Sequence, residues 1–273
     1  MANEKNESGL AGRRQALREL LARMESVAIA FSGGVDSSYL LAEAAGVPGL
    51  HVLALTADSP SLPTEDRLQA VALAKRLNVE HRFVRTAEME NPLYIANGPD
   101  RCYHCKSALF TELMDVAGRE KIRFVLYGAN ADDQSDYRPG HRAAEECGIR
   151  APLAELGFTK KEIREALRDM GLAVAEKPAA ACLSSRIPYG TPISATLLDR
   201  VDRAESALRA LGFSGCRVRA HGDVARLEVP PDAIEHAAGP IRLKIVEVVR
   251  QAGFRYVALD LAGYRTGSLN EVL

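Results

Sequence analysis

Short apolar runs and amphipathic stretches alternate along the first two-thirds of the chain. Runs rich in Val, Ile, Leu and Phe predict buried parallel strands, and the stretches between them have the apolar spacing of helices. The strands are expected at Val27–Phe31, Val52–Thr56, His81–Val84 and Phe124–Tyr127. The helices are expected at Leu10–Arg23, Ser37–Ala45, Glu65–Leu77, Ser107–Glu120 and Lys160–Met170. This order predicts an α/β fold with a doubly wound parallel sheet.

The pattern changes at Lys177, where small residues and prolines interrupt the helical spacing. Beyond this point the chain predicts a small α+β domain. Its elements are expected at Ala195–Leu211, Cys216–Ala220, Ala225–Val229, Ile241–Ala252 and Tyr256–Leu261. We therefore expect a large domain over residues 1–178, a functional linker over 179–193 and a small domain over 194–273.

Charge and composition narrow the function classes. The chain has 35 Lys and Arg against 36 Asp and Glu, so it lacks the basic field that a long nucleic acid requires. No apolar stretch reaches the roughly 18–20 residues that span a bilayer, and the N-terminus is polar. Five cysteines, an odd number, argue against a disulfide framework and favour thiol or metal chemistry. We expect a cytoplasmic protein without a membrane or nucleic-acid partner.

The segment Phe31-Ser-Gly-Gly-Val-Asp-Ser-Ser38 is the most informative motif. A buried strand precedes it, Gly33 and Gly34 permit a tight turn, and the following helix start offers free backbone N–H groups to an anion. The glycine-spaced Walker loop ending in Lys does not occur. The motif resembles the PP-loop of ATP pyrophosphatases, which cut ATP between its α and β phosphates. A common Gly-Gly turn with a Ser or Asp cap is the plain alternative.

Three loops should converge where parallel strands end, because ligands of open α/β sheets bind beyond the carboxyl ends of the strands. These are the loop at Ser32, the segment Thr56-Ala-Asp58 and the segment Gly128-Ala-Asn130. An acidic loop with Asp132, Asp133 and Asp136 follows the last of them. It fits a magnesium ion, the adenosine ribose or an ordinary polar surface.

The cysteines suggest several chemistries. Cys102 and Cys105 form a CxxC expected in a loop before the helix at Ser107, and Cys182 stands alone in the linker. The pair fits half-buried thiols, a redox pair or half of a zinc site with His104; with Cys182 it also fits a [4Fe–4S] cluster that has one open iron. Cys147 and Cys216 are expected to be packing residues.

Two arginines alternate on one strand. Arg217 and Arg219 flank Val218, so their side chains should share one face, which suits a phosphate or a solvated surface. Lys106, directly after the CxxC, could neutralise departing pyrophosphate or simply face solvent.

Four motifs together resemble the LarE family of ATP-dependent sulfur transferases, which mature the nickel-pincer cofactor of lactate racemase. They are Ser32–Ser37, Asp136–Gly140, Cys182–Gly190 with its Ser-Ser-Arg-Ile-Pro-Tyr-Gly string, and Arg217–Arg219. The resemblance implies that a carboxylate of pyridinium-3,5-biscarboxylic acid mononucleotide is adenylated and that sulfur then displaces AMP. It extends to Leu259–Arg265 and spans nearly the whole chain.

The resemblance also implies residue roles. Asp36, Lys106, Arg186 and Cys182 would be catalytic. The mononucleotide phosphate would contact Arg217, Arg219 and Ser185. ATP with Mg²⁺ would bind at Ala30, Phe31, Ser32, Gly33, Gly34, Asp36, Ser37, Ser38, Thr56 and Gly128.

The family has two sulfur strategies. Some members sacrifice the sulfur of their linker cysteine, and others hold a [4Fe–4S] cluster on three cysteines and accept sulfide from an external source. Cys102 and Cys105 favour the cluster form, with Cys182 as the third ligand. The family also implies a homohexamer with an intersubunit metal site, to which Glu205 would contribute. His236 falls near another acidic position of that site, which argues against the site in this chain.

Three other functions compete. A PP-loop enzyme of tRNA thiolation would need an RNA-binding surface, against which the balanced charge argues. An ammonia-using synthetase has no use for three loop thiols. A nucleotide-binding regulatory module would keep the loop without catalysis, and pyrophosphate release on adding substrate would separate it from an enzyme.

Overall fold

A computed structural model describes residues 2–135, 139–178 and 181–265. The chain divides into two compact units. The first, here the large unit, comprises Met1–Asp58, Asp66–Glu88 and Cys102–Lys177; the second, the small unit, comprises Ser59–Glu65, Met89–Arg101 and Pro178–Leu273. Across the described ranges, no helix combines the length and apolarity that a membrane span requires.

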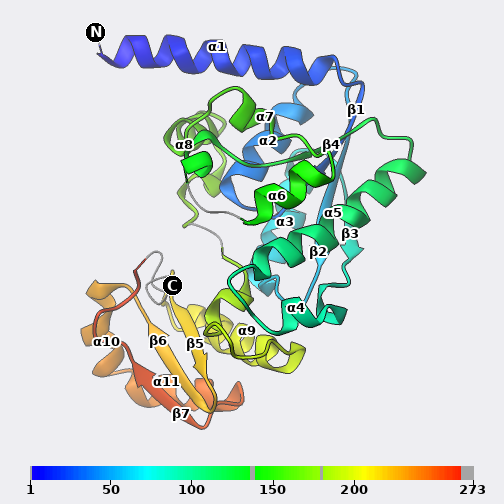
Figure 1. The fold of residues 1–273 in the computed structure, drawn as a ribbon. Helices are drawn as coiled ribbons and strands as arrows, with labels where there is room; N and C mark the ends of the chain where they lie inside the picture. Colours follow the sequence, from blue (N-terminus) through cyan, green and yellow to red (C-terminus); the bar gives the residue numbers. More distant parts are fainter. Residues whose placement is uncertain (1, 136–138, 179–180, 266–273) are drawn as a thin grey trace. The chain divides into compact units, whose positions relative to one another are not determined.

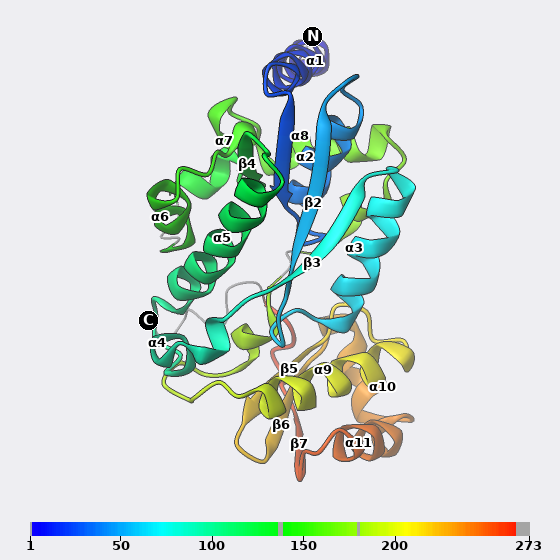
Figure 2. The same cartoon turned by 90° about the vertical axis from the view of Figure 1, so that its right-hand side faces the viewer.

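The large unit contains a four-stranded parallel sheet of order β3-β2-β1-β4 (Figures 1 and 2). Its strands are β1 (Ser26–Ala30), β2 (His51–Asp58), β3 (Glu80–Arg85) and β4 (Phe124–Tyr127). In register, Ala28 of β1 lies opposite Leu53 of β2 on one side and Val125 of β4 on the other. The strand order therefore reverses between β1 and β4, which is the switch point where ligands of such sheets bind.

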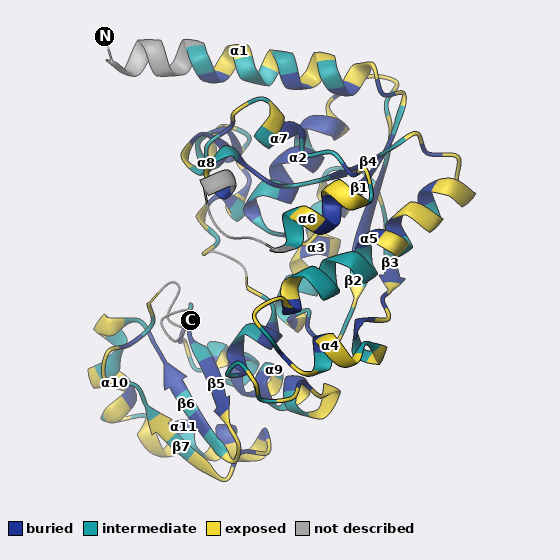
Figure 3. Ribbon diagram, in the orientation of Figure 1, coloured by how far each residue is buried: buried dark blue, intermediate teal, exposed yellow. Residues whose placement is uncertain are grey.

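Helices cover both faces of this sheet, and each face has its own core. One face packs against α1 (Ala2–Ala22), α2 (Val35–Ala45), α3 (Thr64–Arg76) and α8 (Lys160–Asp169), with the short α7 (Pro152–Glu155). The other face packs against α5 (Arg101–Arg119) and α6 (Pro139–Glu146). Figure 3 shows that β1 and the middle of β2 are buried, whereas the edge strand β3 is mostly exposed or half-buried. The predicted doubly wound α/β fold is confirmed.

Helix α5 begins earlier than expected. The prediction that Cys102 and Cys105 lie in a loop before a helix at Ser107 is wrong, because both lie in the first turns of α5. The apolar stripe of this helix extends back to Tyr103, which packs with Phe110 and Leu113 in the core of this face. That helical spacing stabilises the additional turns.

The small unit contains a three-stranded sheet of order β5-β6-β7. β5 (Arg217–His221) pairs antiparallel with β6 (Val224–Glu228), which pairs parallel with β7 (Tyr256–Leu259). Helix α9 (Ala195–Ala210) packs on β5 and on α11 (Arg242–Gln251), and α11 packs on β7. The short helices α4 (Pro92–Ile95) and α10 (Ile234–Ala238) also belong to this unit. This is the α+β arrangement that the sequence predicts.

The segment expected to be a linker is built into the small unit. The division between the two units falls after Lys177, and part of the following segment is packed. Leu183 and Ile187 are buried, and the backbone N–H of Leu183 donates to the carbonyl of Ser61 at 2.8 Å. The side-chain amide of Asn97 donates to the carbonyls of Ile187, Pro188 and Thr191. Segments distant in sequence therefore hold this part of the chain in place.

Candidate functional site

The PP-loop motif forms a tight turn between β1 and α2. Gly33 has a φ of +67°, and a Cβ at this position would lie 3.3 Å from the Cβ of Ala70. The hydroxyl oxygens of Ser32 and Ser37 lie 3.2 Å apart across the turn, and the N–H of Ser32 donates to Ser37 Oγ at 3.3 Å. Helix α2 starts after Gly34 without a side-chain cap, so its first backbone N–H groups point toward the turn.

Gly128, at the end of β4, contacts the start of α2 directly. A Cβ at this position would lie 2.4 Å from the backbone nitrogen of Ser37 and 2.8 Å from the carbonyl carbon of Asp36. No side chain fits there. Two of the three loops that the sequence places at the strand ends thus meet at the switch point.

Asp36 lies between two polar groups from other loops. Its Oδ2 contacts the ammonium of Lys160 at 2.6 Å, and its Oδ1 accepts from the amide of Asn130 at 3.3 Å. Lys160 is the first residue of α8, whose start is fixed by a capping box of Thr159 and Glu162. The helix cap therefore sets where the Lys160 side chain begins.

A second lysine contacts the PP-loop from its other side. Lys177 Nζ donates to the carbonyl of Gly33 at 3.0 Å and lies 2.9 Å from Oδ1 of Asp66. The carbonyl and the carboxylate orient the ammonium beside the turn. Two lysines thus border the loop, and neither belongs to a predicted site.

The end of β2 is joined to β1 by side-chain contacts. Thr56 donates its hydroxyl to the carbonyl of Phe31, so its oxygen is left to accept from Nε2 of His81 at 2.8 Å. Burial, and then the charge of Arg67, lowers the pKa of His81 below its ordinary value. The neutral imidazole packs edge-on against Phe31 and Phe83.

The predicted ATP-binding residues differ in accessibility. Ser32 is exposed, whereas Ser38 is fully buried and its backbone N–H donates to the carbonyl of Gly34 at 3.0 Å. This arrangement argues against a direct phosphate contact by Ser38. Ala30, Phe31 and Thr56 are also buried, so any ligand there would meet mainly backbone or edge atoms.

The acidic loop after β4 is stabilised by its own carboxylates. Asp133 accepts from the backbone N–H of Asn130 at 3.1 Å, and Asp132 accepts from the backbone N–H of Lys160 at 2.8 Å. These contacts join the loop to α8 and help to hold Asn130 beside Asp36. Asp136 lies outside the described residues.

The CxxC lies on one face of α5. Cys102 and Cys105 are three residues apart in a helix, so their side chains are neighbours. Cys102 is exposed and Cys105 is half-buried. The hydroxyl of Tyr103 donates to Glu146 at 2.6 Å, which ties this turn to α6. The ammonium of Lys106 lies 5.6 Å from the centre of the Phe110 ring, and its role toward pyrophosphate stays a prediction.

The third cysteine of the predicted cluster belongs to the other unit. Cys182 is half-buried in the small unit, whereas Cys102 and Cys105 are in the large unit. Over the described parts of the chain, no group of three or more His, Cys, Asp and Glu side chains has an arrangement that could hold a metal ion. Whether the three thiols meet stays a prediction. Cys216 is buried and Cys147 packs against the core, as expected of packing residues.

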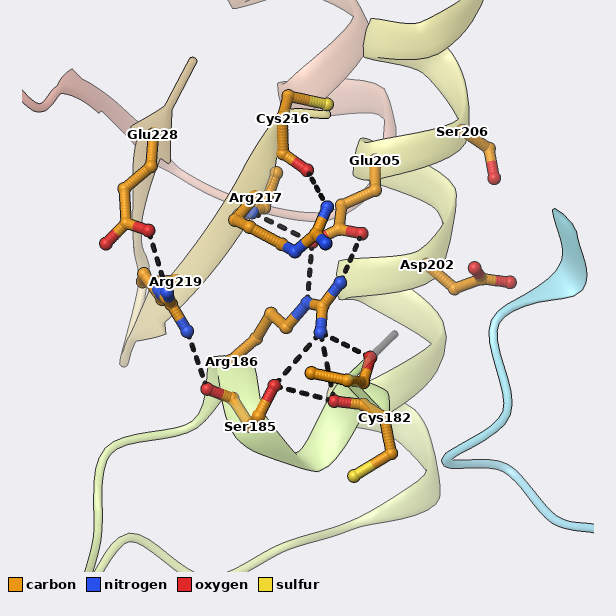
Figure 4. Close-up of polar contacts among 12 residues, drawn as sticks. Cys182, Ser185, Arg186, Asp202, Glu205, Ser206, Cys216, Arg217, Arg219 and Glu228 are labelled. Atoms are coloured by element: carbon orange, nitrogen blue, oxygen red, sulfur yellow. Dashed lines mark hydrogen bonds and ion pairs between the residues drawn. The ribbon is translucent and has the colours of Figure 1, made fainter. Parts of the chain in front are cut away.

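Arg186 lies at the centre of a buried polar network in the small unit (Figure 4). Its Nε and one terminal nitrogen donate to the two carboxylate oxygens of Glu205 at 2.8 and 3.1 Å. The other terminal nitrogen donates to the carbonyls of Ala181 and Cys182 and to Ser185 Oγ. Every nitrogen of this guanidinium therefore contacts the protein.

Glu205 is buried on α9 and has several donors. Its Oε1 also accepts from the backbone N–H of Val218 at 3.0 Å, and its Oε2 lies 3.5 Å from Arg209. Burial alone would raise the pKa of this carboxyl, but Arg186 and the Val218 N–H outweigh it, so the pKa is lowered. The described partners of Glu205 are thus an ion pair and a backbone N–H, and its contribution to an intersubunit metal site stays a prediction.

The two arginines of β5 have different surroundings. Arg219 is buried, lies 2.7 Å from Oε2 of Glu228 and donates to the carbonyl of Ser185 at 2.7 Å. Arg217 is half-buried, donates to the carbonyl of Cys216 and lies 5.1 Å from the centre of the Tyr264 ring. Burial, and then the neighbouring Arg186, lowers the pKa of Arg217. A nearby anion would relieve this repulsion.

Sequence reasoning missed Lys160 and Lys177. Lys160 lies within a Thr-x-x-Glu capping signature, directly after the cap Thr159 and before Glu162, which could have identified it as the first residue of a helix at the site. For Lys177 we find no local signal, because its partners are Gly33 and Asp66.

Comparisons with known proteins agree with this geometry. The asparagine synthase family model matches residues 14–133. An uncharacterized protein of Synechocystis is 44% identical over 97% of this chain and 99% of its own. Pyridinium-3,5-bisthiocarboxylic acid mononucleotide synthase of Lactiplantibacillus plantarum is 36% identical over 97% of this chain and 96% of its own. An uncharacterized protein of Methanocaldococcus jannaschii is 28% identical over 89% and 92%.

The matched family model covers the PP-loop, the strand β1 before it and the two strands that flank β1, which are β2 and β4. The named relative extends the similarity through the small unit. Identity above 30% along nearly the full length of both proteins places the chain in one family with that synthase. The chain therefore belongs to the LarE family of ATP-using, sulfur-transferring PP-loop enzymes.

Proposed function

We propose that this protein transfers sulfur to pyridinium-3,5-biscarboxylic acid mononucleotide in two steps. A substrate carboxylate oxygen attacks the α-phosphorus of ATP, so that pyrophosphate leaves and an acyl adenylate forms. A sulfur nucleophile then attacks the acyl carbon, AMP leaves and a thiocarboxylate remains. The product would serve the nickel-pincer cofactor. The name of the relative, which specifies a bisthiocarboxylic acid, suggests that both carboxylates react in turn.

The observation that carries the proposal is the PP-loop with Asp36 and two lysines beside it. Asp36 would orient ATP with its Mg²⁺, while Lys160 and Lys177 would offset phosphate charge as the pyrophosphate forms. Preorganised cations and backbone N–H groups stabilise such developing charge. Lys106 is proposed to assist the departure of pyrophosphate.

Arg217 is the better candidate of the two arginines for the mononucleotide phosphate. Its guanidinium is half-buried and lies over an aromatic ring, while that of Arg219 is committed to Glu228 and Ser185. An arginine beside another cation gains from an anionic ligand.

The cysteines fit the cluster form of sulfur delivery. Two thiols on one helical face are accessible, as cluster ligands must be during assembly. Cys102, Cys105 and Cys182 would hold a [4Fe–4S] cluster, which would supply an iron site for external sulfide. If Cys182 instead lost its sulfur in one turnover, mass spectrometry would detect dehydroalanine there.

Stoichiometry tests the proposal. Anaerobically purified protein, ATP, Mg²⁺, sulfide and the mononucleotide should yield pyrophosphate and AMP in equal amounts, together with a thiocarboxylate detected by mass spectrometry. Asp36→Asn should lower pyrophosphate release by about two decades or more. Asp115→Asn is the matched control, because Asp115 is exposed on α5 and pairs only one turn away with Arg119.

Two results would contradict the proposal. Wild-type protein that releases no pyrophosphate with this substrate does not adenylate it. Equal rates in Asp36→Asn and Asp115→Asn would remove Asp36 from the ATP site.

We also expect a homohexamer in solution, which light scattering would measure.

A further inference from the structure

Residues 181–186, here called the cysteine turn, are held by side chains from two other elements of the small unit (Figure 4). The carbonyl of Cys182 accepts three donors: the backbone N–H of Ser185 at 3.0 Å, the hydroxyl of Ser185 at 2.8 Å and Arg186 at 3.1 Å. A carbonyl with three donors has little freedom to rotate.

Glu205 anchors this arrangement to α9 and β5. It accepts two parallel hydrogen bonds from Arg186, and a planar fork of this kind fixes the guanidinium in both position and orientation. The same carboxylate accepts from Val218 of β5, so Arg186 is positioned against two rigid elements. Arg219 adds a bond from β5 to the carbonyl of Ser185 at 2.7 Å.

Burial keeps Arg186 and Glu205 paired with each other. The side chains of Arg186 and Glu205 are 3% and 1% exposed. An ion pair so enclosed does not exchange readily with an external anion, because separating the charges leaves one of them buried and unpaired. The described contacts therefore assign Arg186 to the backbone of the cysteine turn.

We propose that Glu205 is a positioning residue for Cys182: by holding Arg186, it fixes the backbone of the cysteine turn and thereby the direction of the Cys182 thiol. Its consequence for sulfur transfer rests on the proposed function, whereas its effect on the thiol does not. A thiol that must reach an acyl carbon or a shared cluster benefits from a fixed backbone.

Thiol reactivity tests this in the full-length protein without substrate, after a chelator and air have removed any iron–sulfur cluster, because cluster-bound thiols do not react. The alkylation rate of Cys182 by iodoacetamide is measured by peptide mass spectrometry, with exposed Cys102 as the reference for reagent. Glu205→Gln should raise the ratio of Cys182 to Cys102 alkylation about fivefold or more, since loss of the ion pair with Arg186 lets the cysteine turn open locally. Glu247→Gln, at an exposed ion pair on α11, should leave the ratio unchanged.

Cys216 reports whether the small unit remains folded. It is buried beside β5, and burial raises the pKa of its thiol to about 11, so it should resist alkylation. An unchanged Cys182 ratio in Glu205→Gln with Cys216 protected would overturn the proposal. If Cys216 also reacts, that variant has unfolded, and Ser185→Ala decides instead. Ser185→Ala removes one Arg186 contact and one donor to the Cys182 carbonyl without unpairing a charge. A twofold or greater rise supports the view that these contacts hold the cysteine turn, whereas no change overturns it.

Sulfur transfer provides the second measurement. In Glu205→Gln the thiocarboxylate formed per pyrophosphate released should fall about tenfold, because misplacing a reacting group slows the sulfur-transfer step. A lower amount of folded protein would not change this ratio. An unchanged ratio alongside faster alkylation would overturn the role in transfer. A wild-type protein that makes no thiocarboxylate would refute the proposed function, while the alkylation result would still decide whether Glu205 positions Cys182.

Discussion

The PP-loop of the large unit and the cysteine turn of the small unit both depend on paired charges, but they use them differently. At the PP-loop, Lys160 is 33% exposed and Asp36 is 17% exposed, and their contact is one ammonium against one carboxylate oxygen. At the cysteine turn, Arg186 and Glu205 are almost completely enclosed and joined by a two-bond fork.

This difference separates charges available to a ligand from charges that support the fold. A partly exposed lysine keeps water nearby and can move toward an anion at small cost. A buried arginine with a matched carboxylate cannot be withdrawn without a large desolvation penalty. Motif resemblance assigns catalytic roles to residues of both regions, and the two regions differ in how far their charges are buried.

The largest expected effect tests whether the PP-loop depends on the close contact between Gly128 and the backbone at the start of α2. Gly128→Val should abolish pyrophosphate release, because even a Cβ at this position would lie 2.4 Å from the backbone nitrogen of Ser37 and would displace the start of α2. Gly118→Ala on α5 is the control, since a Cβ there meets nothing within 4 Å. Activity and thermal unfolding are measured for both. An active Gly128→Val would show that α2 need not lie against β4.

The next effect tests whether the arginines of β5 have separate roles. Arg219→Ala should lower the free energy of unfolding by about 3 kcal/mol, because it leaves Glu228 buried without its nearest counterion. Arg217→Ala should cost less stability and instead raise the KM for the mononucleotide. Denaturant titration and steady-state kinetics measure the two quantities. The reverse pattern would mean that Arg219 binds the phosphate.

A smaller effect tests the lysine at the PP-loop. Lys160→Ala should lower pyrophosphate release about 100-fold, in line with the loss of one preorganised charge, and should leave the unfolding midpoint nearly unchanged. Arg168→Ala removes an exposed cation from the same helix and serves as the control. If both variants retain full activity, Lys160 acts only as a surface partner of Asp36.

The smallest effect concerns pH. The pKa of His81 is lowered in the folded protein by burial and by Arg67, so the unfolded chain binds a proton first as the pH falls. The stability from neutral His81 is complete above its ordinary pKa of about 6.5 and declines below it. His81→Gln should make the unfolding midpoint less dependent on pH between about pH 7 and pH 5. His51→Gln, at an exposed position, should not.

The strands and the long helices of both units follow from local patterns in the sequence, whereas the starts of α1 and α5 and the short helices α4, α7 and α10 were not predicted. Strand Phe124–Tyr127 is observed as predicted, and helix α8 differs from its predicted range only at its last residue. Apolar periodicity depends on neighbours within a few residues, so it can be read without the fold. The PP-loop is also local, because its glycines, serines and aspartate are consecutive.

Contacts across the chain required the tertiary structure. Lys160 is 124 residues from Asp36, Lys177 is 144 residues from Gly33 and Glu205 is 19 residues from Arg186. Nothing in the spacing of these residues predicts their distance, because strand crossovers and helix packing bring them together. Only the packed structure determines which charges remain accessible, since burial depends on every element that surrounds a side chain.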